Sequence, residues 1–168
     1  MVKPLIDYHI FDGKDQDGRH HSDVMAFTKE EFLSNHDFIQ WIFPTKTKSA
    51  FNEYAPLLDE ETIEYLRYEI TFKTRFKLSL AKTFGILGIP YQRSGSSFKI
   101  SPLTEKLYWM NYDDHNLVRL TRIMESCRLL GYEKLSRNLF EVLLYSNPDF
   151  HFIQVENIKF WYKAVFGQ

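Results

Sequence analysis

The sequence predicts an all-α fold, a single compact domain of about six to eight helices that spans residues 1–168. Seven glycines and six prolines in 168 residues are too few for a chain of many short strands and tight turns. Apolar residues recur at helical spacing in several segments, and most of these segments begin with a residue that caps helices. Aromatic residues make up 17% of the chain, so we expect a thick aromatic core and an aromatic-lined groove.

The first third of the chain contains a short and a longer predicted helix. Residues 22–27 are long enough for one helical turn. Thr28 and Glu31 then have the spacing of a capping box, in which each side chain bonds the other residue's backbone amide. We expect the helix that starts there to continue to about Phe43, because Pro44 cannot extend it.

The middle of the chain predicts a second helical block. Asp59 has the character of an N-cap and is followed by acidic residues, which the positive end of a helix favours. Helical spacing continues to Leu87, with a break expected near Ile70, and Gly88 ends the block. Residues 91–101 are predicted to be a mobile polar loop.

Four helices are predicted after this loop. The first covers residues 102–110, with proline at an allowed position in its first turn. The second runs from His115 to Leu130, capped by the aspartates at 113 and 114 and ended by Gly131. The third covers residues 133–145 and should stop before Pro148, and the last covers residues 155–166.

Composition and charge narrow the classes of function. The net charge of −1 argues against nucleic-acid binding, and the single cysteine, Cys127, excludes an intrachain disulfide and a multi-cysteine zinc site. No apolar stretch approaches the ~20 residues of a membrane span, and no signal peptide is visible, so a soluble cytoplasmic protein is expected. Catalytic and nucleotide-binding motifs are absent from the sequence. We therefore predict no catalytic residue, no metal and no cofactor.

Three segments resemble a known family. Residues 35–44 read NHDFIQWIFP, residues 83–86 read TFGI, and residues 115–133 contain HNLVRLTRIM followed by LLGYE. In this order and spacing they resemble the conserved region of the opioid growth factor receptor, and the agreement extends from about residue 5 to 165. The resemblance implies an intracellular helical domain.

The same resemblance implies a binding role. In animals the family name records the binding of an enkephalin peptide, with nuclear-associated growth control. This chain ends at Gln168 and lacks a run of lysine and arginine, so a short stand-alone family member is expected. The resemblance supplies no ligand-binding residues.

One candidate site lies on the predicted helix from Thr28. At ~100° per residue, His36 and Gln40 are neighbours at the margin of a broad apolar arc, and Asp37 lies just beyond. These three residues could form the polar mouth of an aromatic pocket, with His36 as a proton donor or acceptor. In the alternative, His36 and Gln40 hold a neighbouring loop by its backbone.

A second candidate site lies on the predicted helix from His115. His115, Arg119 and Arg122 form a stripe ~60° wide, beside an apolar arc that includes Cys127. The two guanidinium groups could bind a carboxylate or a phosphate, with His115 as a third donor. In the alternative, the arginines pair with carboxylates of the protein itself.

The leading hypothesis is a non-enzymatic module that binds a peptide or another protein. The first alternative is an enzyme or a small-anion-binding protein whose pocket combines the two candidate sites through His36, Asp37, His115, Arg119 and Arg122. The second is nucleic-acid binding through a set of basic residues, namely Arg67, Lys73, Arg75, Lys77 and Lys82.

Overall fold

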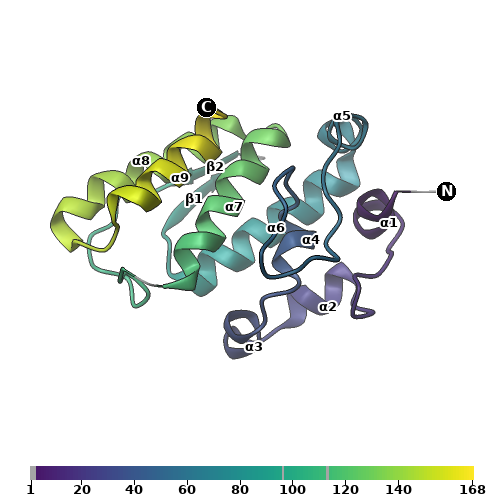
Figure 1. Ribbon diagram of the computed structural model, residues 1–168, viewed down its shortest axis with the longest axis horizontal. Helices are drawn as coiled ribbons and strands as arrows, with labels where there is room; N and C mark the ends of the chain where they lie inside the picture. The colour runs from purple at the N-terminus through teal and green to yellow at the C-terminus, as the bar shows by residue number, and fades with distance from the viewer. Residues whose placement is uncertain (1–2, 96, 113) are drawn as a thin grey trace. The chain divides into compact units, whose positions relative to one another are not determined.

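The computed structural model describes residues 3–95, 97–112 and 114–168, and this part of the chain forms nine helices and one two-stranded sheet (Figure 1). The fold is therefore mostly helical, as predicted, but it is not purely α-helical. The chain divides into two compact units, Met1–Lys82 and Thr83–Gln168, and the division falls within one helix, α6 (Ile70–Leu87). A single domain stays a prediction.

The first unit contains short helices, two of which begin at predicted caps. Thr28 Oγ1 accepts a hydrogen bond from the Glu31 amide at 3.2 Å, and the Glu31 carboxylate accepts one from the Thr28 amide at 2.7 Å. Asp59 Oδ1 accepts a hydrogen bond from the Thr62 amide at 2.8 Å. The helices of this unit are α1 (Pro4–Ile10), α2 (His21–Ala26), α3 (Lys29–Ser34), α4 (Ile39–Ile42), α5 (Glu60–Tyr68) and the first part of α6 (Ile70–Leu87).

The single helix predicted from Thr28 to Phe43 is wrong. It ends at Ser34, and Asn35 is extended, with φ −88° and ψ 140°, before α4 adds one further turn. The backbone between the two helices is held by side chains from elsewhere, since the Asp37 carbonyl accepts hydrogen bonds from Asn52 and Gln16. Such bonds replace those of a continuous helix.

Aromatic rings fill the centre of the first unit. The Tyr8 ring centroid lies 5.2 Å from that of Trp41 and 5.1 Å from that of His9. His9 also meets Phe72 edge to face at 5.0 Å, and its ring centroid is 6.3 Å from that of His21. All five side chains are buried, so the predicted aromatic core is confirmed here.

The predicted break near Ile70 and the predicted end after Leu87 are both confirmed. Glu69 has an extended conformation, with ψ 123°, and separates α5 from α6. Gly88 follows α6 with φ 68°, a conformation that favours glycine.

The second unit is built on three helices that pack together (Figure 1). The helix α7 contacts both α8 and α9, and the strand β2 packs against α8. The Trp161 indole of α9 donates a hydrogen bond to the Leu117 carbonyl of α7, at 3.1 Å. Asp114 caps α7 as predicted, whereas residue 113 lies outside the described residues. The elements are β1 (Tyr91–Ser94), β2 (Ser97–Ile100), α7 (His115–Leu129), α8 (Glu133–Phe150) and α9 (Val155–Phe166).

Two predictions between residues 91 and 110 are wrong. The polar segment from Tyr91 to Ile100 is an antiparallel hairpin rather than a loop, because Tyr91 and Phe98 pack together over Phe84. Residues 102–110 do not form a helix. Instead, the Trp109 indole donates a hydrogen bond to the Leu87 carbonyl at 2.6 Å, and its ring is fully buried.

The helix α8 continues past the residue at which it was predicted to stop. Pro148 lies inside it, two residues before the end, so only one late backbone hydrogen bond is lost. Asn147 compensates at this end, since its Oδ1 accepts hydrogen bonds from the amides of Phe152 and Ile153 at 3.0 and 2.8 Å. The predicted start of α8 and both ends of α9 are confirmed.

Across residues 3–95, 97–112 and 114–168, every helix is too short or too polar to cross a membrane.

Candidate functional site

The first candidate set lies around α4, but not on one helix face. His36 is exposed and Asp37 is half-buried, and both belong to the non-helical segment before α4. Gln40 is buried in α4, where its amide donates hydrogen bonds to the His36 carbonyl and to Ser49 Oγ, both at 3.1 Å. Gln40 therefore bonds the backbone of its own segment, whereas the alternative placed this bond at a neighbouring loop.

An arginine links Asp37 to the loop between α1 and α2. Arg19 donates hydrogen bonds to Asp15 at 2.7 Å, to Asp17 at 2.9 Å and to Asp37 at 3.0 Å. The Asp15 side chain is fully buried and also accepts the amides of Asp17 and Arg19, both at 2.9 Å. The carboxylates of this loop are thus organised by a cation that the protein supplies.

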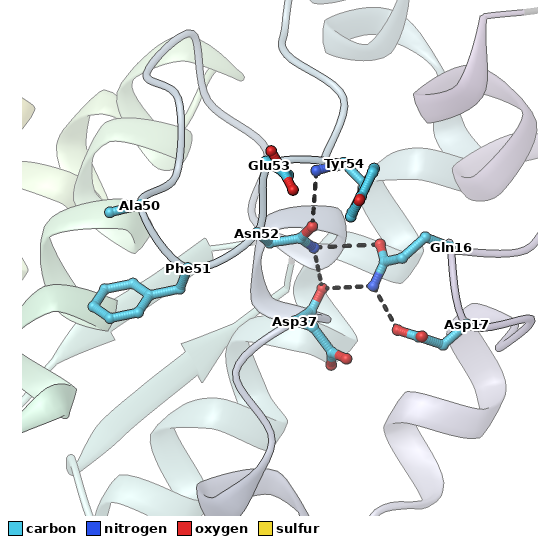
Figure 2. Close-up of a pocket in the computed structure, with 8 residues that line it drawn as sticks. All are labelled: Gln16, Asp17, Asp37, Ala50, Phe51, Asn52, Glu53 and Tyr54. Atoms are coloured by element: carbon cyan, nitrogen blue, oxygen red, sulfur yellow. Dashed lines mark hydrogen bonds between the residues drawn. The ribbon is translucent and has the colours of Figure 1, made fainter.

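Beside Asp37 the surface forms a pocket of about 400 Å³ (Figure 2). In Figure 2 the amide side chains of Asn52 and Gln16 point toward each other at its centre, with the Asp37 backbone between them. Asn52 Nδ2 donates to the Asp37 carbonyl at 2.8 Å and to Gln16 Oε1 at 3.3 Å. The residues that line the pocket are Gln16, Asp17, Asp37, Ala50, Phe51, Asn52, Glu53 and Tyr54.

The central amides of this pocket are saturated by the protein. Asn52 Oδ1 accepts the Tyr54 amide at 3.1 Å, and Gln16 Oε1 accepts the indole N–H of Trp41. Gln16 Nε2 donates to Asp17 at 2.6 Å, and this bond holds the pKa of the Asp17 carboxyl below its usual range. The amides therefore fix the shape of the pocket, and its charged groups are carboxylates.

The rim of the pocket carries exposed aromatic rings. Tyr54 is 76% exposed and Phe51 is 61% exposed. In Figure 2 the Tyr54 side chain lies near Gln16, whereas the Phe51 ring points away from Asn52. Exposed aromatic residues next to a pocket are a common feature of surfaces that bind polypeptides.

The sequence identified only Asp37 among the residues that line this pocket. Asn52 and its aromatic neighbours lie in an irregular segment, residues 45–59, that contains no motif. No signal in the sequence could have identified Asn52. Its contact is long-range, because its side-chain amide donates to the backbone carbonyl of Asp37.

The second candidate set lies on α7, in the second unit. Arg119 is 5% exposed, Arg122 is half-buried and His115 is exposed. Burial lowers the pKa of both guanidinium groups, and Arg119 Nη1 donates a hydrogen bond to Asn116 Oδ1 at 3.5 Å. The apolar arc of this helix is buried, and Cys127 lies fully within it. The anion site on α7 stays a prediction.

We expect Arg119→Gln to lower the free energy of unfolding by about 1–3 kcal/mol, because it removes a charged donor from a buried position. Arg122→Gln should lower the free energy of unfolding by less, since Arg122 is only half-buried. Thermal shift of both variants and the wild type, with and without phosphate at constant ionic strength, tests the two interpretations. Stabilisation by phosphate in the wild type alone would assign the pair to an anion site, and equal responses in all three proteins would exclude it.

Comparison with known proteins gives a match over most of the chain. Residues 13–164 match the family model described as the opioid growth factor receptor conserved region. The chain belongs to this family. No solved structure gives a significant match.

Relatives in vertebrates share part of this sequence. The chain is 30% identical over 117 residues to mouse opioid growth factor receptor-like protein 1, which covers 69% of the chain and 25% of the mouse protein. It is 29% identical over 116 residues to the Xenopus tropicalis protein of the same name, covering 68% of the chain and 22% of that protein. Human opioid growth factor receptor is 26% identical over 112 residues, covering 66% of the chain and 16% of the human protein. The chain thus spans a quarter or less of these relatives.

Proposed function

We propose that this member of the opioid growth factor receptor family is a non-enzymatic module that binds a polypeptide, and that the Asn52 pocket receives a lysine or arginine side chain of the partner. The names of the relatives describe receptors, which supports an interaction role. The observation that carries the proposal is the negative charge of the pocket: three of its eight lining residues are acidic and none is basic.

A cationic side chain matches the groups that the pocket offers. The Asn52 and Gln16 amides are occupied by internal hydrogen bonds, so they are poor partners for a ligand. The carboxylates of Asp17 and Asp37 are 47% and 41% exposed, and Glu53 is exposed beside them. The single positive charge of Arg19 is shared among Asp15, Asp17 and Asp37, so the pocket keeps a net negative charge for a ligand. Charged hydrogen bonds of this kind are among the stronger contacts at protein interfaces.

The aromatic rim supplies the apolar part of the contact. The alkyl part of a lysine or arginine side chain can pack against Tyr54 while its charged end reaches a carboxylate. The ring face also attracts a cation directly. The pocket therefore favours a basic residue of a polypeptide over an anion or an apolar side chain.

The test uses peptides selected from a random display library on the wild-type protein. We expect the selected peptides to contain lysine or arginine, and Glu53→Lys to weaken their binding about tenfold or more, because it places like charges together. Glu53 is exposed, so this change should leave the thermal midpoint within the error of measurement.

The matched control is Glu64→Lys, which makes the same change of charge at an exposed position on α5. It should leave peptide binding unchanged. The proposal fails if the selected peptides lack basic residues, or if Glu53→Lys and Glu64→Lys affect binding equally.

A further inference from the structure

The hairpin of the second unit has one open edge, and its register shows which backbone N–H and C=O groups lie along that edge. The partners in the two strands are Gln92 with Lys99 and Ser94 with Ser97, and the Ser101 amide donates to the Pro90 carbonyl at 2.9 Å. Hydrogen-bonded pairs alternate with non-bonded pairs in an antiparallel ladder.

Because Pro90 and Ser101 are hydrogen-bonded, the bonded pairs of the ladder are those of Gln92 and Ser94. The backbone N–H and C=O groups of Tyr91 and Arg93 therefore point away from β2, along the outer edge of β1.

The two edges of this sheet differ. At the outer edge of β2, the Ile100 amide donates to Asn138 Oδ1 at 2.6 Å, and β2 packs against α8. At the outer edge of β1, the backbone amides of Tyr91 and Arg93 make no hydrogen bond to any residue that the structure describes. Residues 92–95 are exposed, so solvent reaches this edge. An open strand edge of this kind is a template for a further strand.

We propose that the edge of β1 binds an extended, acidic segment of a partner polypeptide as a third strand. The hairpin from Tyr91 to Ile100 contains Arg93 and Lys99 and no acidic residue, so it is complementary to a segment rich in glutamate or aspartate. The Arg93 guanidinium lies 5.8 Å from the centroid of the Phe98 ring, so its positive charge lies over the hairpin itself.

The same charges argue against a second copy of this chain as the occupant. Pairing β1 with β1 would bring two such hairpins together, and each carries two positive charges that nothing in the other offsets. The exposed face of the hairpin is formed by Gln92, Ser94, Ser97 and Lys99, and it offers hydrogen-bond donors to the side chains of an added strand.

The probe is a short blocked peptide of alternating threonine and glutamate, and the measurement is amide hydrogen exchange by NMR. In the free protein, the amides of Tyr91 and Arg93 should exchange rapidly. Saturating peptide should slow both at least tenfold, while a peptide with lysine in place of glutamate should have little effect. Unchanged exchange at Tyr91 and Arg93 with millimolar peptide would overturn the proposal.

Methylated peptides test the backbone pairing directly. Two versions of the peptide carry N-methyl groups on alternate residues. The version whose methylated nitrogens face β1 should not bind, and the version whose methylated nitrogens face away from β1 should bind. Equal loss or equal binding of the two peptides contradicts strand addition.

A variant of the protein gives the reciprocal test. Arg93→Pro removes an outward N–H without removing a bond of the β1–β2 ladder, so the hairpin should persist and peptide binding should be lost. Arg93→Gln removes the same charge but keeps the N–H, and it should retain the protection of the Tyr91 amide with reduced affinity. Glu64→Lys, on α5 in the other unit, should leave this binding unchanged.

Discussion

Trp41→Ala should lower the free energy of unfolding by about 3–5 kcal/mol, the range for removing a large buried aromatic side chain. Trp41 is 5% exposed and its ring centroid lies 5.2 Å from that of Tyr8. Its indole N–H donates to Gln16, so the substitution also leaves a central amide of the pocket without one donor. Urea-induced unfolding, followed by circular dichroism, measures the loss.

Two further variants separate the contributions of the Trp41 side chain. Trp41→Phe keeps most of the ring but removes the N–H, and it should cost about 1–2 kcal/mol. Tyr68→Ala removes an aromatic side chain that is 78% exposed on α5, and it should change stability by less than about 0.5 kcal/mol. If Trp41→Ala behaved as Tyr68→Ala does, Trp41 would not belong to the core.

Local signals in the sequence were sufficient for the helix starts. Thr28, Asp59 and Asp114 all cap the helices that they were predicted to cap, because a capping interaction involves residues at most three positions away. The whole of α9 was predicted from a different local signal, the helical spacing of its apolar residues.

The interruptions of helices were set by contacts distant in sequence. Nothing near Asp37 signals the gap between α3 and α4, because the bonds to its carbonyl come from Gln16 and Asn52. The hairpin had a local signal, a serine-glycine turn between Tyr91 and Phe98, but its polar composition favoured a loop. Its stability depends on packing against Phe84.

The candidate site was predictable to a smaller extent. Of the first three residues that the sequence singled out, Asp37 lines the pocket and Gln40 supports the segment before α4. The error arose from assigning one continuous helix, which fixed the wrong relation between His36 and Gln40. The pocket itself depends on a side chain from residues 45–59, an irregular segment with no periodicity to analyse.

Two buried histidines in the first unit make its stability dependent on pH. His9 Nε2 donates to the Trp41 carbonyl at 2.8 Å, and its Nδ1 is buried with no hydrogen-bond partner among the described residues. His21 Nε2 lies 2.9 Å from Ser79 Oγ, and it is the donor because the Ser79 hydroxyl donates to the Arg75 carbonyl. In each ring the bonded nitrogen is Nε2, and a neutral imidazole with its proton on Nε2 can make the bond.

Burial is the main reason why the pKa of each imidazole is low. It lowers the pKa of His9 to about 3, with a further contribution from the neighbouring His21. It lowers the pKa of His21 to about 4, with a further contribution from the positive charge of Arg75. In the unfolded chain both rings take up protons near pH 6.5.

Acid should therefore destabilise the first unit as the pH falls below about 6.5. Each histidine contributes its full stability above pH 6.5, and this contribution is lost as the pH falls toward the folded-state pKa, because the unfolded chain then binds more protons. Between pH 7 and 4.5 we expect a loss of unfolding free energy on the order of 2 kcal/mol for each histidine.

His21→Gln keeps a donor for Ser79 but cannot titrate, so its unfolding free energy should fall about half as steeply over this range. His151→Asn replaces an exposed histidine in a left-handed conformation that asparagine tolerates, and it should leave the slope unchanged. Urea-induced unfolding at intervals of pH measures all three slopes, and equal slopes for wild type and His21→Gln would show that His21 takes up its proton at the same pH in the folded and unfolded states.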